Sequence, residues 1–154
     1  MKLIPLKFLL ISLSILSFGF KFKPDVQILY CGDNEFLSNL SSLTKEESLL
    51  QSWIFNSKTG QLYKYDDLKN SLIPITREVN NGYEDIYRNN YIEDNKLYFE
   101  NFYRSLESFN DEGKGRNLID FKNLTFTYNQ IGDEEIYHVN CKEIQLPKNI
   151  QILK

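Results

Sequence analysis

Short runs of β-branched and aromatic residues alternate along this chain with turn-forming residues. The clearest run is residues 124–128, where Leu124, Phe126 and Tyr128 lie on one side and two threonines lie on the other. Alternation with a period of two residues is typical of a strand with one buried face. Comparable runs occur at residues 26–31, 53–56, 61–65, 85–92, 97–104, 118–121 and 136–143.

Turn-forming residues separate these runs at intervals of about ten residues. The spacing predicts a mainly β fold, an antiparallel meander of about seven or eight strands that is curled or closed as a small barrel. A weaker run at residues 72–75 contains Pro74, which has no backbone N–H and would confine that strand to a sheet edge. Residues 108–117 are polar and contain Gly113 and Gly115, so they are predicted to form a flexible loop.

One short helix is predicted after the first strand. Thr44 is suited to the N-cap position, and Glu47, three residues later, can complete a capping box. The helix is expected over residues 44–51, because Ser41 and Ser42 interrupt the stripe of leucines that precedes it.

A hairpin is predicted over residues 53–65, where two strands flank a short polar loop that ends in Gly60. Such a loop suits a turn whose last residue is left-handed, a conformation that glycine adopts at little cost. We expect aromatic contacts across the two strands, from Trp53 and Phe55 on the first to Tyr63 and Tyr65 on the second.

The N-terminal segment has the pattern of an export signal. Lys2 and Lys7 supply positive charge, residues 8–18 are apolar apart from serines, and Ser17 and Gly19 are small residues placed as at a cleavage site. The apolar stretch is shorter than the roughly 20 residues that span a bilayer.

The sequence therefore predicts a cleaved signal peptide at residues 1–19 and a single exported β-rich domain at residues 20–154. The domain is expected in the periplasm or outside the cell. The alternative is an uncleaved N-terminal anchor, which would supply the domain's membrane contact.

Two cysteines, Cys31 and Cys141, lie near the two ends of the exported domain. In an oxidising compartment the expected state is one disulfide. A loop of this length is worth at most about 4 to 5 kcal/mol in the chain-entropy model. The bond would require the first and last strands to lie side by side; the alternative is two separate buried thiols.

Composition and charge argue against one further class of partner. Loss of Lys2 and Lys7 takes the net charge from −3 to −5, and the chain has only four arginines, which argues against nucleic acid as a partner. Alanine is absent while asparagine, lysine, isoleucine, phenylalanine and tyrosine are abundant, which indicates an AT-rich genome. The same bias favours strands over helices.

We find no residue set for catalysis, a metal or a cofactor. His138 is the only histidine and is expected to face solvent from the middle of a strand. With one histidine and oxidised cysteines, zinc has no ligand set. Pairs of acidic residues lie near predicted turns, where solvated carboxylates are common: Asp66-Asp67, Glu84-Asp85, Glu93-Asp94, Asp111-Glu112 and residues 133–135.

Aromatic residues concentrate on two predicted hairpins, where they either fill the core or line a concave groove. Such a groove would bind an apolar or planar ligand or a partner strand. The candidate ligand-binding residues are Trp53, Phe55, Tyr63, Tyr65, Tyr98 and Tyr103.

The function predicted from the sequence is non-enzymatic binding, by an exported β-domain, of a small apolar or planar ligand or of an envelope protein. One alternative is a structural or stress-related envelope protein without a ligand. The other is a hydrolase that uses paired carboxylates. The sequence names neither the ligand nor the partner.

Overall fold

The computed structural model of the chain describes residues 25–108, 111–132 and 134–154. Its strands are β1 (Val26–Gly32), β2 (Trp53–Asn56), β3 (Leu62–Asp66), β4 (Ser71–Ile75), β5 (Arg77–Asn80), β6 (Tyr83–Glu93), β7 (Lys96–Ser105), β8 (Asp111–Asp120), β9 (Thr125–Gln130), β10 (Ile136–Ile144) and β11 (Gln151–Ile152). Three short helical segments separate β1 from β2, namely α1 (Asn34–Ser38), the 3-10 helix η1 (Asn39–Ser42) and α2 (Lys45–Leu50). The predicted mainly β fold is confirmed.

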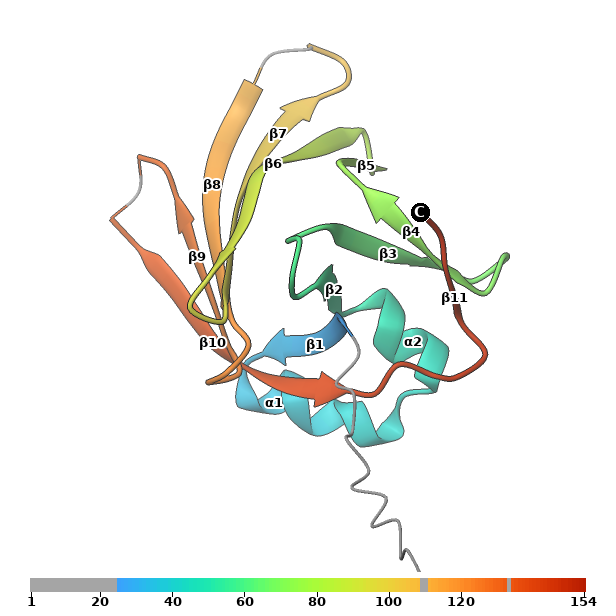
Figure 1. Cartoon of the computed structure of the whole chain (residues 1–154). Coiled ribbons are helices and arrows are strands. Elements are labelled where there is room, and N and C mark those ends of the chain that lie inside the picture. Colours follow the sequence, from blue (N-terminus) through green and yellow to red (C-terminus); the bar gives the residue numbers. More distant parts are fainter. Residues whose placement is uncertain (1–24, 109–110, 133) are drawn as a thin grey trace, which may run out of the picture.

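The eleven strands of the described residues form one sheet in the order β11-β4-β3-β2-β1-β10-β9-β8-β7-β6-β5. The sheet curls into an open half-barrel (Figure 1). Its neighbouring strands are antiparallel, except for the parallel pair of β11 and β4. The predicted curled antiparallel sheet is confirmed, but it has more strands than expected and it is open.

Thr76 alone joins β4 to β5, although these strands lie toward opposite ends of the strand order. The curl brings the two ends of the sheet together here, and the Thr76 carbonyl accepts a hydrogen bond from the backbone N–H of Tyr87 in β6 (2.8 Å). Since β11 pairs with β4 only at Ser71 and Leu72, Pro74 lies on an edge segment of β4, as its missing N–H predicts.

Two apolar clusters stabilise the half-barrel. The main core fills the inner face of the curled sheet and consists of Leu29, Phe55, Leu62, Ile75, Leu97, Phe99, Ile119, Phe121 and Cys141. A second cluster contains Leu49 of α2 and lies on the outer face of β1–β4, with Val26, Ile28, Ile54, Tyr65 and Leu72. The first four strands are therefore apolar on both faces, while among the described residues none from β6–β9 belongs to the second cluster.

The predicted capping box is present at the start of α2. The Thr44 hydroxyl accepts a hydrogen bond from the backbone N–H of Glu47 (3.2 Å), and the Glu47 carboxylate accepts one from the backbone N–H of Thr44 (2.7 Å). The preceding helix α1 was not predicted, although Asp33 caps it by accepting a hydrogen bond from the backbone N–H of Phe36 (2.8 Å).

The turn between β2 and β3 forms as predicted, with Gly60 at a φ of 75°. The register pairs Ile54 with Tyr63 and Phe55 with Leu62. Directly paired residues share a face, so Phe55 points into the main core and Tyr63 to the outer cluster. The expected contacts of Trp53 and Phe55 with Tyr63 and Tyr65 are therefore wrong, because the actual pairing places the two sets on opposite faces.

The predicted loop at residues 108–117 is wrong for its larger part, because β8 begins at Asp111. Pairing with β7 on one side and β9 on the other overrides the low strand propensity of Gly113 and Gly115. Both glycines lie under aromatic rings. A Cβ atom at Gly113 would collide with Tyr103, and one at Gly115 would collide with Tyr128. The glycines make room for these rings.

The predicted disulfide between Cys31 and Cys141 is confirmed. It joins β1 to β10, which are antiparallel neighbours in the middle of the sheet. Disulfides persist in oxidising compartments, so the bond is consistent with export. The predicted signal peptide at residues 1–19 lies outside the described residues, and no helix in the described part of the chain is long and apolar enough to cross a membrane.

Candidate functional site

The inner face of the long strands changes from apolar to polar along their length. Cross-strand partners share a face, and the row nearest the middle of the main core is Leu97, Ile119 and Phe126. The next rows are Phe99, Asn117 and Tyr128; then Tyr87, Asn101, Gly115 and Gln130; then Glu78, Asp85, Tyr103 and Gly113. Aliphatic side chains give way to tyrosines, amides and carboxylates.

We call six of these residues the polar inner face: Asp85, Asn101, Tyr103, Asn117, Tyr128 and Gln130. A chain of hydrogen bonds crosses it, from the Asn117 amide to Asn101 Oδ1 (3.0 Å) and from the Asn101 amide to Asp85 Oδ1 (3.4 Å). The Gln130 amide also donates to the Tyr103 hydroxyl (3.2 Å). These bonds fix the directions of the polar groups that remain accessible.

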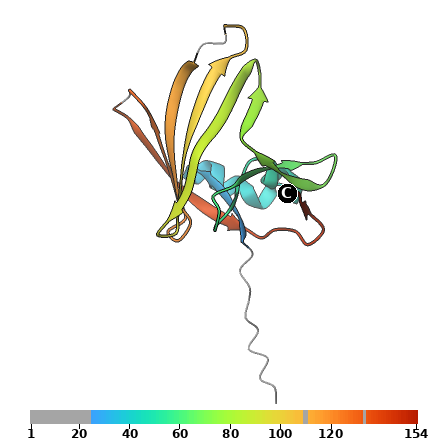
Figure 2. The same ribbon diagram turned by 45° about the horizontal axis from the view of Figure 1, so that its top comes forward.

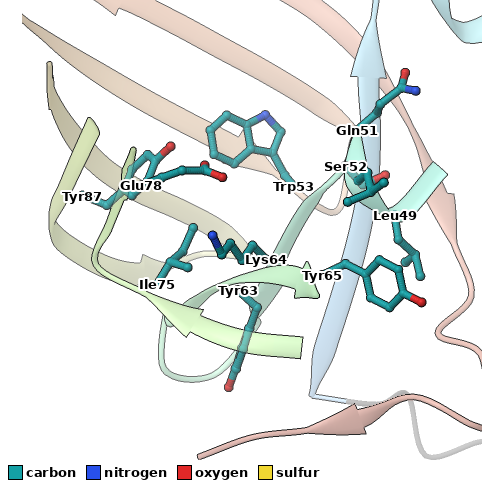
Figure 3. Close-up of a pocket in the computed structure, with 11 residues that line it drawn as sticks. Leu49, Gln51, Ser52, Trp53, Tyr63, Lys64, Tyr65, Ile75, Glu78 and Tyr87 are labelled. Carbon is teal, nitrogen blue, oxygen red and sulfur yellow. The ribbon is translucent and has the colours of Figure 1, made fainter. Parts of the chain in front are cut away.

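A cleft of about 470 Å³ lies beside this face, between the end of α2 and strands β2–β6 (Figure 3). We call it the Trp53 cleft. Its lining residues are Leu49, Leu50, Gln51, Ser52, Trp53, Tyr63, Lys64, Tyr65, Ile75, Glu78 and Tyr87. Figure 3 shows Trp53, Ile75, Lys64, Glu78 and Tyr87 gathered on one side, with Leu49 and Tyr65 on the other.

The Trp53 ring is held by three other aromatic rings. Its centroid lies 5.2 Å from that of Phe99 and 5.4 Å from that of Phe126, and it meets the Tyr87 ring edge to face at 6.5 Å. Such contacts restrict ring motion and add to the burial energy. Trp53 is thus a rigid surface between the main core and the cleft.

The Tyr87 hydroxyl stays protonated over a wide pH range. Burial raises the pKa of Tyr87 well above its ordinary value, and the negative charges of Asp85 and Glu78 raise it further. A neutral phenol can donate one hydrogen bond and accept others. Tyr87 therefore offers a polar tip at the boundary of the cleft and the polar inner face.

Two carboxylates face the same space, and neither forms an ion pair among the residues that the structure describes. Glu78 and Asp85 are direct cross-strand neighbours, a placement that is unfavourable for like charges. Lys64 also lines the cleft, but no ion pair joins it to Glu78 in the described part of the chain. A cation and an anion thus line one aromatic cleft, and Asp85 lies directly across from the anion on the neighbouring strand.

The structure separates the six residues that the sequence singled out. Trp53, Tyr63 and Tyr65 line the cleft, although the Tyr63 ring points away from Trp53 (Figure 3). Phe55 is 0% exposed and contacts Phe121 inside the main core. The remaining two lie elsewhere: Tyr98 stacks on Tyr91 (4.8 Å) on the outer face, and Tyr103 lies on the polar inner face.

Several residues of the site were missed from sequence, namely Lys64, Glu78, Tyr87 and Asn101, and Asp85 was expected only as a solvated acid near a turn. A signal for Asn101 was present, since it has the same strand parity as Leu97 and Phe99, the buried residues of β7. A polar residue in phase with core residues marks where a buried face becomes polar. Glu78 had no such signal, because apolar and polar residues do not alternate along β5.

Other charged and polar side chains that could take part in chemistry already have partners within the protein. The expectation that acidic pairs lie in wet turns is wrong for Glu84, which is 3% exposed within β6. Its carboxylate binds Arg104 (2.6 Å) and Arg77 (3.3 Å). His138 is exposed, as predicted, and its Nδ1 lies 2.8 Å from the Thr127 hydroxyl. The described residues contain no group of three or more metal-ligating side chains.

Comparison with protein-family models, with curated proteins and with solved structures finds no match to this chain.

Proposed function

We propose that the protein is an exported β-domain that binds a small ligand in the Trp53 cleft without transforming it. The ligand places an apolar or planar face against Trp53 and Tyr87, and its polar groups meet Lys64 and Glu78. A volume of about 470 Å³ is within the range of small-molecule sites. Export is supported by the N-terminal pattern and by the disulfide.

The observation that carries this proposal is the combination of a ring cluster with charged groups held apart. Trp53 is fixed by Phe99, Phe126 and Tyr87, which makes one wall rigid before a ligand arrives. Lys64 and Glu78 line the same cleft without pairing. Binding sites typically combine an apolar, pre-formed wall with a few convergent polar groups.

Trp53 provides the test, because it is the only tryptophan of the chain. Titration of the exported protein with anilinonaphthalene sulfonate, a planar apolar probe, is expected to give saturable energy transfer from Trp53 with one site per chain. Tyr87→Ala should weaken the binding by about tenfold, the effect of losing one good contact.

Tyr91→Ala is the matched control, since Tyr91 stacks on Tyr98 on the outer face, away from the cleft. It should leave the titration unchanged. Absence of saturable binding to a folded, disulfide-bonded protein would contradict the proposal and favour a structural protein without a ligand. Equal effects of Tyr87→Ala and Tyr91→Ala would place the probe elsewhere.

A hydrolase is the second candidate, favoured by the pairing of Glu78 with Asp85. Directly paired residues have Cβ atoms about 4.5 to 5.5 Å apart, and glycosidase carboxylates act at separations of about 5 to 10 Å. If this candidate holds, purified protein will release new reducing ends from a polysaccharide, and both Glu78→Gln and Asp85→Asn will abolish the release.

An envelope-protein partner is the third candidate. In the described part of the chain β5 pairs with β6 alone, which leaves one side of β5 open to an added strand. Crosslinking from an exported variant with a photoreactive residue at Val79, which is 59% exposed, would test it. A specific crosslinked protein is the expected result, and its absence would contradict this candidate.

A further inference from the structure

The Trp53 cleft is continuous with the polar inner face through Tyr87, which lines the cleft and pairs with Asn101 in β7. We propose that the cleft and the polar inner face together bind a carbohydrate, a neutral glycan segment that extends from Trp53 along the strands. This inference rests on the proposed function, because it names the ligand class of the same site.

The mixture of hydrogen-bonding groups favours a polyol. Glu78 and Asp85 supply acceptors, Lys64 supplies donors, and the Tyr87 hydroxyl supplies both. A sugar hydroxyl can donate and accept at once, so neighbouring hydroxyls can satisfy the carboxylates and the ammonium group together. A purely apolar ligand would leave these charges desolvated without partners, which is costly.

The aromatic rings are positioned as platforms. Gly113 and Gly115 have no side chains, and the rings of Tyr103 and Tyr128 lie against the backbone there. One side of each ring is therefore occupied by β8, and both residues remain partly exposed. Tyrosine combines an apolar ring face with a polar tip, which matches a sugar ring with C–H groups on its faces and hydroxyls at its rim.

The amides are fixed before any ligand binds. Asn101 accepts from Asn117 and donates to Asp85, which leaves one N–H and one lone pair of its amide for a ligand. Gln130 is directed by its bond to Tyr103. Polar groups held in place by such bonds reduce the entropy lost on binding.

Nothing in the described fold covers this face with a helix. Figures 1 and 2 show α1 and α2 beside β1, away from the ends of β7 and β8 that carry Tyr103 and Gly113. The outer face of β1–β4 is the one that α2 covers. A chain-like ligand could therefore run along the inner face from the cleft.

The test is titration of the exported, disulfide-bonded protein with a panel of hexasaccharides: cellohexaose, maltohexaose, xylohexaose, laminarihexaose and chitohexaose. Trp53 fluorescence and calorimetry report binding. At least one hexasaccharide should bind with one site per chain. Asn101→Ala and Tyr103→Ala are each expected to raise its Kd by about tenfold, the usual effect of losing one buried hydrogen bond or one ring contact.

Tyr98→Ala, on the outer face, is the matched control and should leave the Kd unchanged. Tyr103→Phe keeps the ring and should retain most of the affinity; if Tyr103→Ala fails to fold, Asn101→Ala carries the test of the polar inner face. Saturable binding of anilinonaphthalene sulfonate with no binding of any hexasaccharide would overturn the carbohydrate inference and keep the proposed function. Failure of both probes would overturn both, and hexasaccharide binding unaffected by Asn101→Ala and Tyr103→Ala would overturn the role of the polar inner face.

Discussion

Cys31 and Cys141 are direct cross-strand partners on β1 and β10, with Cα atoms 4.0 Å apart and their sulfurs bonded. In the strand order, β1 ends the series β4-β3-β2-β1 and β10 begins the series that continues to β5. The disulfide therefore lies where the two halves of the sheet join. It ties together strands that are separated by 110 residues in the sequence.

Removal of this bond should destabilise the domain strongly. For Cys31→Ser/Cys141→Ser we expect the free energy of unfolding to fall by about 2 to 5 kcal/mol, because the unfolded chain regains the entropy of a long loop. Urea unfolding of the double variant and of the oxidised parent measures this. Reduction of the parent with dithiothreitol should give the same loss, and equal stability of the oxidised and reduced parent would contradict the prediction.

Glu84 should be important for stability although it does not line the cleft. It is buried and binds both Arg104 and Arg77. Glu84→Ala leaves Arg104 without its partner in a partly buried place, and we expect a loss of about 2 to 4 kcal/mol in thermal or urea unfolding. Glu93→Ala, which removes an exposed carboxylate at the end of the same strand, should change stability by less than about 0.5 kcal/mol. Similar values for the two variants would show that the Glu84 ion pairs are not stabilising.

Gly115 should not tolerate a side chain. A Cβ atom there would collide with the Tyr128 ring and with the Asn101 side chain. For Gly115→Ala we expect a loss of about 1 to 3 kcal/mol, the usual cost of overpacking. The loss should shrink when Tyr128→Leu is present, because the two positions are coupled through the collision. Additive effects in this double-mutant cycle would contradict the contact.

Tyr87 should make stability depend on alkaline pH. Burial, with the charges of Asp85 and Glu78, raises the pKa of Tyr87 in the folded protein above its unfolded value, which is about 10. Above that pH the unfolded state loses a proton that the folded state keeps, so this group's contribution favours unfolding progressively as the pH rises. Urea unfolding between neutral pH and pH about 11 should show a steeper loss for the parent than for Tyr87→Phe. Parallel pH profiles would show that Tyr87 does not titrate differently in the two states.

The sequence by itself determined the local elements that a short stretch of chain can specify. Thr44 and Glu47 define the start of α2 because both partners of the capping box lie within one turn. Gly60 defines a turn because its left-handed φ is a local property. The alternating runs gave most strands, and the mainly β, curled architecture followed from their number and spacing. The disulfide followed from two cysteines in a chain whose N-terminal pattern predicts export.

Tertiary structure decided what depends on partners far away in the chain. β8 is a strand because β7 and β9 pair with it on both sides, which overrides the propensities of Gly113 and Gly115. Phe55 and Tyr63 lie on opposite faces because register depends on pairing, and one residue of shift exchanges the faces. The candidate site could not be predicted from the sequence for the same reason. Trp53, Glu78, Tyr87 and Asn101 come from four strands, and only the curl of the sheet brings them together.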